Sequence, residues 1–516
     1  MPAALLKNIR TSTDWDQTPS EDETGHWIFA AASEAMLYWP QSVIVQGHSM
    51  LPAVIPIGTV MYHGRPDQDV PTAPDWLAFD YEHAYFFAEP PKGYVLTFTT
   101  KRALRVIFFD GLSAHHGRDT QQVFTYGKVD EEGTAPFDLH EELCEWAKDH
   151  NIDGFMRAEM HFEVINCNFA SSLELLSTDR ALPSEEMIGQ LFKSEPTARD
   201  DSHLRPAGWV GSLPTDMWSE LDMAAKWHDF APGETRARPV LSKFVTFYDP
   251  AVKSLKAGRK GKMRDQHRLI GIEAEEAKMM MEQLEHVVKD GAGWDERSGV
   301  SEVDWESILR VVVERYGERL EFLNNTLAVD SDSTIKPFAR LRKARQQVLT
   351  TLLPYFTLSD APPSNLANLS SSAALEGKRA WLAPVIQRCA ATHTRSLPTH
   401  LFTKQETLLY NGVQTVMREI CRRMGRMFYT TYDIETIGST EDGYSAIAES
   451  MRVEINELTD WLDWVQVWLK CRPACSSDEY CIPSNGIPGD IPHRGASLHG
   501  YQGDRRSPQC FKRPNA

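Results

Sequence analysis

The spacing of apolar residues changes near residue 265, and this change constrains the fold more than any other feature of the chain. Before it, turns and short helical stretches separate four β-rich runs, at Thr59–Tyr62, Tyr94–Thr99, Val106–Phe109 and Phe162–Asn166. After it, apolar residues recur at helical spacing, and a capping box, Thr403-x-x-Glu406, begins a strong helix. Amphipathic helices must bury their apolar stripes against one another. We therefore predict an α+β domain followed by a mainly α-helical bundle.

These patterns also predict the domain organisation. We expect an N-terminal polar segment and helix at 1–45, the α+β domain of small mixed sheets at 46–180, an irregular connector rich in Trp and Pro at 181–264, the helical bundle at 265–470, and a coil tail with cysteines at 471–516. Within them, Ile28–Tyr38 and Leu139–His150 are predicted helices, and Phe244–Tyr248 is a further predicted strand.

The charge and the apolar runs limit the partners and the compartment. A net charge of −18 opposes nucleic-acid binding, because phosphate contacts need clustered Lys and Arg. No apolar run is long enough to span a bilayer, so we expect no transmembrane segment. The expected partner is an unknown protein or a small-molecule acceptor. The N-terminus has no apolar leader, which predicts a cytoplasmic protein by default, or one of the secretory pathway if the N-terminus is incomplete.

The eight cysteines complicate this expectation. Four of them, Cys471, Cys475, Cys481 and Cys510, lie among Pro and Gly near the C-terminus. Such a cluster is typical of a disulfide-stabilised terminus in an oxidising compartment. The spacing leaves disulfides, free thiols and a metal site all open, with His493 and His499 as further ligands in the metal case.

Residues 58–169 contain the candidate site. His63 ends a predicted strand and is followed by Gly64, which would let a ligand approach the backbone. Asp80 would cap a helix rich in aromatic residues. Glu163 lies between apolar residues of a strand, where an unpaired carboxylate is costly. Plainer interpretations exist for each: a satisfied strand-end His, core aromatics, and a solvated sheet face.

The order of these elements resembles the ADP-ribosyltransferase fold. This resemblance implies a cleft between two small sheets that holds NAD as the cofactor, with no metal. His63 would bind a ribose hydroxyl and the nicotinamide amide, and Glu163 would stabilise the oxocarbenium-like transition state. Tyr81, Tyr85 or Phe87 would stack on the nicotinamide ring. The resemblance thus predicts catalytic residues His63 and Glu163 in a transferase.

The chain as a whole resembles a large family of uncharacterised fungal proteins. Segments that carry this resemblance are Ile57–Gly64, Trp76–Asp80, Phe109–Ser113, Phe247–Pro250, Arg264–Leu269, Arg388–Thr394, Glu419–Arg423 and Cys471–Cys475. No Walker A loop, dinucleotide Gly fingerprint, HExxH or G-x-S-x-G motif is present. The competing hypothesis is a non-catalytic helical interaction protein of the secretory pathway, with a C-terminus held by disulfides and a decayed N-terminal domain.

Overall fold

A computed structural model describes residues 14–88, 93–114, 117–132, 134–136, 138–159, 161–181, 233–289, 294, 301–328, 336–360, 380–431, 440–482 and 508–512. The chain forms two compact units, which are described separately. The helical unit comprises residues 1–33, 248–250 and 303–468, and the sheet unit comprises 34–247, 251–302 and 469–516. Most of the predicted connector, residues 182–232, lies outside the described residues, as do His493 and His499.

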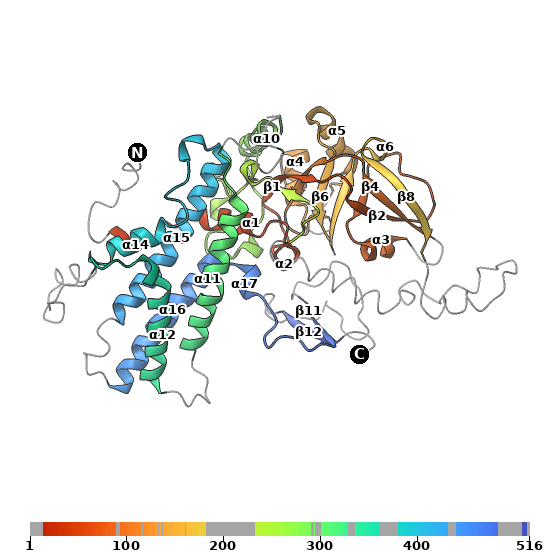
Figure 1. The fold of residues 1–516 in the computed structure, drawn as a ribbon. Coiled ribbons are helices and arrows are strands. Elements are labelled where there is room, and N and C mark those ends of the chain that lie inside the picture. The colour runs from red at the N-terminus through yellow and green to blue at the C-terminus, as the bar shows by residue number, and fades with distance from the viewer. Residues whose placement is uncertain are drawn as a thin grey trace. The chain divides into compact units, whose positions relative to one another are not determined.

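The sheet unit is built on a ten-stranded mixed sheet (Figure 1). Its order is β10-β1-β5-β6-β7-β3-β2-β4-β8, with β9 also paired to β1; β5 and β6 are parallel, and the other pairs are antiparallel. The strands are β1 Ser49–Ile55, β2 Val60–Arg65, β3 Asp75–Ala78, β4 Tyr94–Thr100, β5 Leu104–Phe109, β6 Gly154–Ala158, β7 Phe162–Asn166, β8 Leu173–Arg180, β9 Arg238–Pro239 and β10 Val245–Thr246.

Two apolar clusters attach helices to this sheet. One joins strands β1, β5, β6 and β7 to the helices α4, α5 and α10. The second, smaller cluster joins β2, β3 and β4 to α3. The described residues of the unit form the helices α2 Tyr38–Val43, α3 Tyr81–Phe87, α4 Asp119–Tyr126, α5 His140–His150, α6 Phe169–Ser172, α9 Lys256–Arg259 and α10 Ala274–Lys289, with the 3-10 turns η5 Leu241–Lys243 and η6 Arg264–Gln266.

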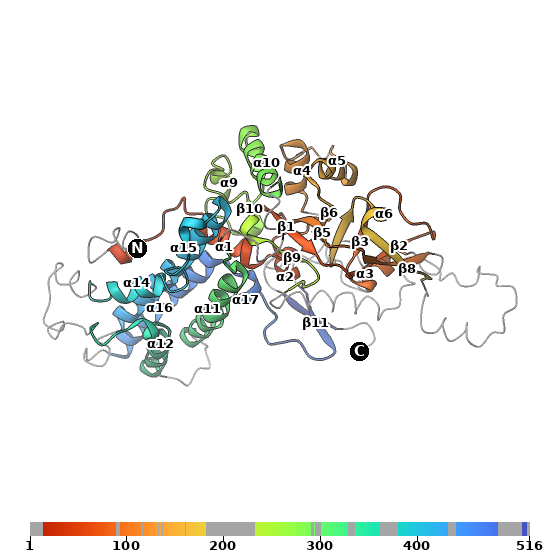
Figure 2. The same cartoon turned by 45° about the horizontal axis from the view of Figure 1, so that its top comes forward.

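The helical unit contains the long helices that the apolar spacing predicts. The helix α15 packs against α1, α12, α14 and α16, and α11 packs against α12 and α16 (Figure 2). The bounds are η2 Asp14–Asp16, α1 Gly25–Ser33, α11 Trp305–Leu327, α12 Pro337–Leu352, η7 Leu353–Tyr355, α14 Ala383–Ala390, η9 Thr399–Leu401, α15 Lys404–Thr430, α16 Glu441–Leu462 and α17 Val465–Trp468. The predicted capping box at Thr403 and Glu406 is present at the start of α15.

Several elements differ from the sequence-based expectations. One helix was predicted at Ile28–Tyr38, but the structure has two: α1 ends at Ser33 and α2 begins at Tyr38. The helix α10, expected in the bundle, instead adds its apolar face to the larger sheet cluster. The tail is not all coil, because β11 Glu479–Ile482 pairs with β12 Gln509–Lys512. This pairing joins segments 27 residues apart, which local periodicity cannot reveal.

All eight cysteines form disulfides. Two bonds lie in the tail, Cys471–Cys481 and Cys475–Cys510, and the second joins β12 to the loop that precedes β11. Cys144–Cys167 joins α5 to the end of β7. Cys389–Cys421 joins α14 to α15 within the helical unit. The structure therefore favours disulfides over the free-thiol and metal alternatives for the tail cysteines. None of the helices in the described part of the chain is long and apolar enough to cross a membrane.

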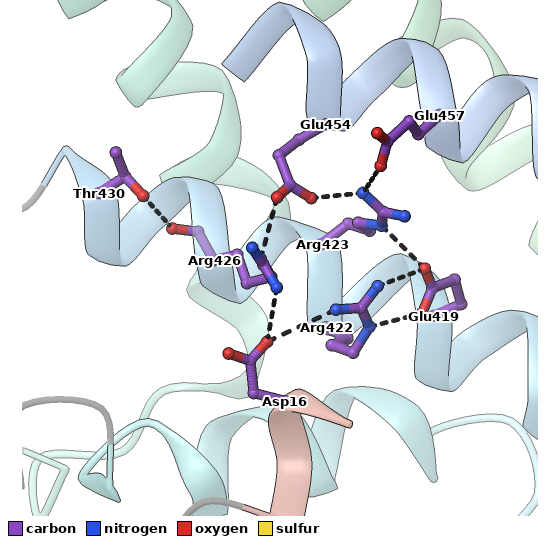
Figure 3. A network of polar contacts seen from close by, with 8 residues as sticks. All are labelled: Asp16, Glu419, Arg422, Arg423, Arg426, Thr430, Glu454 and Glu457. Atoms are coloured by element: carbon purple, nitrogen blue, oxygen red, sulfur yellow. Dashed lines mark hydrogen bonds and ion pairs between the residues drawn. The ribbon is translucent and has the colours of Figure 1, made fainter. Parts of the chain in front are cut away.

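A network of ion pairs connects η2, α15 and α16 in the helical unit (Figure 3). At its centre the Arg422 guanidinium donates to both carboxylate oxygens of Glu419, over 2.6 and 2.7 Å, and both residues are buried. Arg423 donates to Glu419 and to two glutamates of α16, Glu454 and Glu457. Because two arginines share the charge of Glu419, this carboxylate anchors the network.

We expect Glu419→Gln to destabilise the helical unit by roughly 3–5 kcal/mol, because it removes the carboxylate that hydrogen-bonds the buried Arg422 and leaves this arginine only the Asp16 carboxylate, 3.5 Å away, as a counter-charge. The measurement is urea unfolding followed by circular dichroism. The matched control is Glu449→Gln, which removes an exposed partner of Arg452 on α16 and should leave the transition unchanged. An unchanged transition in Glu419→Gln would contradict this account of the network.

Candidate functional site

Five ionisable side chains converge in the sheet unit, and we call them the polar centre: His83, His140, Arg157, Glu159 and Glu163. They come from α3, the start of α5, β6, the β6–β7 turn and β7. Strand pairing sets their positions, because Glu163 lies opposite Arg157 on β6 and opposite Ala78 on β3. Every residue of β6 and β7 is buried, so the centre lies deep within the unit.

The core of this centre is an ion pair between Glu163 and Arg157. The Nε and Nη2 atoms of Arg157 both donate to Oε1 of Glu163, over 2.9 and 2.5 Å. Arg157 is 7% exposed and Glu163 is 3% exposed. Burial makes each charge dependent on the other. Since both bonds reach Oε1, Oε2 of Glu163 stays directed at His83, 4.0 Å away.

His83 approaches these carboxylates from α3. Its ring is fully buried, stacks on the Trp76 indole at 5.6 Å, and places Nε2 at 3.5 Å from Glu159. Neither ring nitrogen makes a hydrogen bond within the described residues. Burial lowers the pKa of His83, but the carboxylates of Glu159 and Glu163 raise it by more, so the net shift is above the ordinary value.

His140 closes the other side of the centre. Its Nε2 lies 3.1 Å from Nη2 of Arg157, and its Nδ1 lies 3.1 Å from the Asp138 carboxylate. Burial and the adjacent Arg157 lower the pKa of His140 to about 4, so the imidazole is neutral at pH 7. A neutral His140 whose Nδ1 carries its proton can accept a hydrogen bond from Arg157 through Nε2. It thereby helps to orient the guanidinium toward Glu163.

His63 lies beside the polar centre. It is buried within β2, where its Nε2 is 3.4 Å from Asp75, and its ring meets Trp76 at 5.0 Å. His63 lies on β2 and Glu163 on β7, and these two strands flank β3. Their backbones are therefore separated by two strand spacings, about 10 Å in total. The Trp76 ring contacts the rings of His63 and His83, and His83 lies 4.0 Å from the Glu163 carboxylate, so these contacts connect the two residues.

Gly64 has a different role from the one its sequence context predicts. A Cβ atom here would lie 1.8 Å from the carbonyl oxygen of Ala84. The glycine therefore admits the backbone of α3 rather than a ligand, and that expectation was wrong. This close approach brings α3, and with it His83, onto the strand that carries His63.

The three candidate stacking residues are placed differently. Tyr81 and Tyr85 belong to the small apolar cluster of α3, where the Tyr81 ring meets the Tyr62 ring at 5.6 Å. Phe87 instead contacts Trp76 at 4.8 Å and His83 at 5.6 Å, next to the polar centre. Among the described ring contacts, Phe87 is the one of the three that meets a residue of the polar centre, His83.

Asp80 does not cap α3 with its side chain, although it occupies the N-cap position. Its carboxylate instead accepts hydrogen bonds from Arg236, over 2.9 and 3.1 Å, and lies 3.3 Å from His161. The second carboxylate that binds Arg236 is that of Glu234. This pairing ties the start of α3 to a segment more than 150 residues away in the chain.

Sequence analysis missed His83, His140, Arg157, Glu159 and Trp76. Arg157 offered the clearest signal, since it is a lone charge in an apolar strand, as Glu163 is. His83 stands within an aromatic helix, where nothing in the sequence shows that its face meets two carboxylates. A separate cavity of about 460 Å³ opens beside the Cys144–Cys167 disulfide, and none of the five residues of the polar centre lines it.

Comparisons with known proteins support the resemblance to uncharacterised fungal proteins. Residues 22–94 and 91–201 match the family model described as the YPL277C N-terminal domain, a range that includes the whole polar centre. The chain is 23% identical over 547 aligned positions to Uncharacterized protein YOR389W of Saccharomyces cerevisiae, covering 89% of this chain and 81% of the relative. It is 27% identical to Uncharacterized protein YPL277C of the same organism over 37% of this chain and half of the relative. No solved structure matches.

Proposed function

We propose that the polar centre is the active site of an NAD-using, ADP-ribosyltransferase-like enzyme. The observation that carries this proposal is the setting of Glu163. Arg157 holds one of its oxygens, and the other faces His83 in a buried site with Trp76 and Phe87 alongside. A fixed carboxylate beside aromatic rings suits a ligand that combines a flat heterocycle with a sugar.

The chemistry follows from the charge that develops on the sugar. When the bond between ribose and nicotinamide breaks, the ribose gains oxocarbenium character, and a fixed carboxylate stabilises this positive charge. The effect is larger in a buried site, where the effective dielectric is low. Glu163 would supply the negative charge, and Arg157 with His140 would keep it in position without taking part in bond breaking.

The neighbouring residues would bind and orient NAD. His63 would bind the nicotinamide end, as the resemblance implies, since its Nδ1 makes no hydrogen bond within the described residues. Phe87 remains the candidate to stack on the nicotinamide ring, and Trp76 joins it because it contacts both His63 and His83. Tyr81 and Tyr85 would act indirectly, by packing α3 onto the sheet.

We expect wild type to bind NAD in EDTA-containing buffer, measured by calorimetry, and to release nicotinamide, measured by chromatography. His63→Ala should weaken NAD binding by at least tenfold. Glu163→Gln should bind NAD but lower the rate of nicotinamide release by about 10²–10³-fold, the usual effect of losing one electrostatic contact to a transition state.

The matched control is His150→Ala. His150 is also a histidine stacked on a tryptophan, Trp146, and near a carboxylate, Glu285, but it lies on α5 away from the polar centre. This variant should bind NAD and release nicotinamide as wild type does. Folded wild-type protein that binds no NAD would contradict the proposal, as would undiminished nicotinamide release by Glu163→Gln.

A second candidate, the non-catalytic interaction protein of the secretory pathway, gains support from the four disulfides. Disulfides are rare in the cytosol and common in secreted proteins, so we propose an oxidising compartment for this chain whichever function holds. Thiol titration of the denatured, unreduced protein purified from its native source should find no free cysteine. Eight free thiols would support the cytoplasmic default instead.

A further inference from the structure

We propose that His83, Glu159 and Glu163 bind one divalent transition-metal ion. Each offers one donor atom, the Nε2 of the imidazole and one oxygen of each carboxylate, and the three atoms lie within 4.8 Å of one another. They come from α3, the β6–β7 turn and β7, so three separate elements direct donors at one point. The resemblance to transferases predicts no metal here, and the proposal departs from it.

The burial of His83 points to a missing ligand. Its side chain is 0% exposed, yet neither ring nitrogen makes a hydrogen bond within the described residues. A buried polar group without a partner costs about 1–3 kcal/mol. The separations of 3.5 and 4.0 Å from Nε2 to the two carboxylates are long for hydrogen bonds. An ion placed between these atoms would give Nε2 a partner and would also contact one oxygen of each carboxylate.

The charges around the site also favour a cation. Glu159 and Glu163 direct two carboxylates at His83, and both hydrogen bonds from Arg157 to Glu163 go to Oε1. Nε2 of His83 thus faces two carboxylates, at 3.5 and 4.0 Å. Carboxylates that bind metals are commonly held by a hydrogen bond from a second residue, and the Arg157–Glu163 pair has this arrangement. The Glu159 side chain is 15% exposed and is the most exposed of the three ligands.

The donor set indicates the class of ion. One imidazole with two carboxylates suits Zn²⁺ or Mn²⁺ better than Ca²⁺ or Mg²⁺, which prefer oxygen donors alone. Metal–ligand distances of about 2.0–2.2 Å require the three side chains to close slightly around the ion. With the three ligands that the described residues supply, a fourth position is left for a further donor, such as an oxygen of water or of a substrate.

The metal proposal stands independently of the proposed transferase function. Both would use Oε2 of Glu163, so we expect the ion and NAD to exclude one another. Nicotinamide release is measured in EDTA, and metal binding is measured without NAD, so either proposal can fail while the other stands.

The test is calorimetric titration of the full chain with ZnCl₂ alone and with MnCl₂ alone, after EDTA treatment and dialysis. Wild type should bind one ion. His83→Ala and Glu159→Gln should each weaken binding by at least tenfold, because each removes a ligand, and His150→Ala should bind as wild type does. Glu159→Gln is the variant expected to keep the fold, since Glu159 lies in a turn and is partly exposed.

Circular dichroism in the near ultraviolet reports whether each variant is folded. The proposal is overturned if folded wild type binds neither ion. It is also overturned if folded Glu159→Gln binds zinc and manganese as tightly as wild type. The proposal is supported if wild type and His150→Ala bind one ion with the same affinity and His83→Ala and Glu159→Gln bind it more weakly.

Discussion

The ion pair between Glu163 and Arg157 is the interaction on which the rest of the polar centre depends. It lies between two apolar clusters: Glu163 is opposite Ala78 of the small cluster and two residues from Ile165 of the large one. Helices from each cluster meet the pair, with His83 on one side and His140 on the other. Two charges in such a place are costly unless each satisfies the other. The position of α3, fixed by the close contact at Gly64, then decides which groups face Oε2 of Glu163.

The helical unit uses buried charges differently. Glu419 is shared by Arg422 and Arg423, and the network extends to exposed groups on α16, so its charges connect helices to one another (Figure 3). In the polar centre, by contrast, neither ring nitrogen of the buried His83 makes a hydrogen bond within the described residues, although two carboxylates lie within 4.0 Å of its Nε2. Arg422 and Arg423 each hydrogen-bond a carboxylate, whereas His83 hydrogen-bonds none within the described residues, and a buried side chain in that state is expected where a ligand binds. This contrast is the reason for placing function in the sheet unit.

Local pattern predicted the parts of the fold that depend on neighbouring residues. The helix α5, the capping box of α15, and the α+β and helical regions follow from periodicity and capping. The candidate site was predicted only in part: Glu163 stands out as a charge in an apolar strand, but its partners do not. Arg157, His83 and His140 meet it through the register of β6, β7 and β3 and through helix docking, which are long-range properties. For the same reason, the sequence pattern did not predict that α10 packs on the sheet or that β11 pairs with β12.

If the polar centre is kept for binding rather than for folding, apolar residues of similar size should replace its ion pair without loss of stability. The most direct test is urea unfolding of the double variant Arg157→Met/Glu163→Leu beside the single variant Glu163→Leu. We expect the double variant to unfold within about 1 kcal/mol of wild type or to be more stable. The single variant, which leaves Arg157 buried and unpaired, should lose roughly 3–5 kcal/mol. A double variant as unstable as the single one would show that the pair serves folding, and would contradict the account.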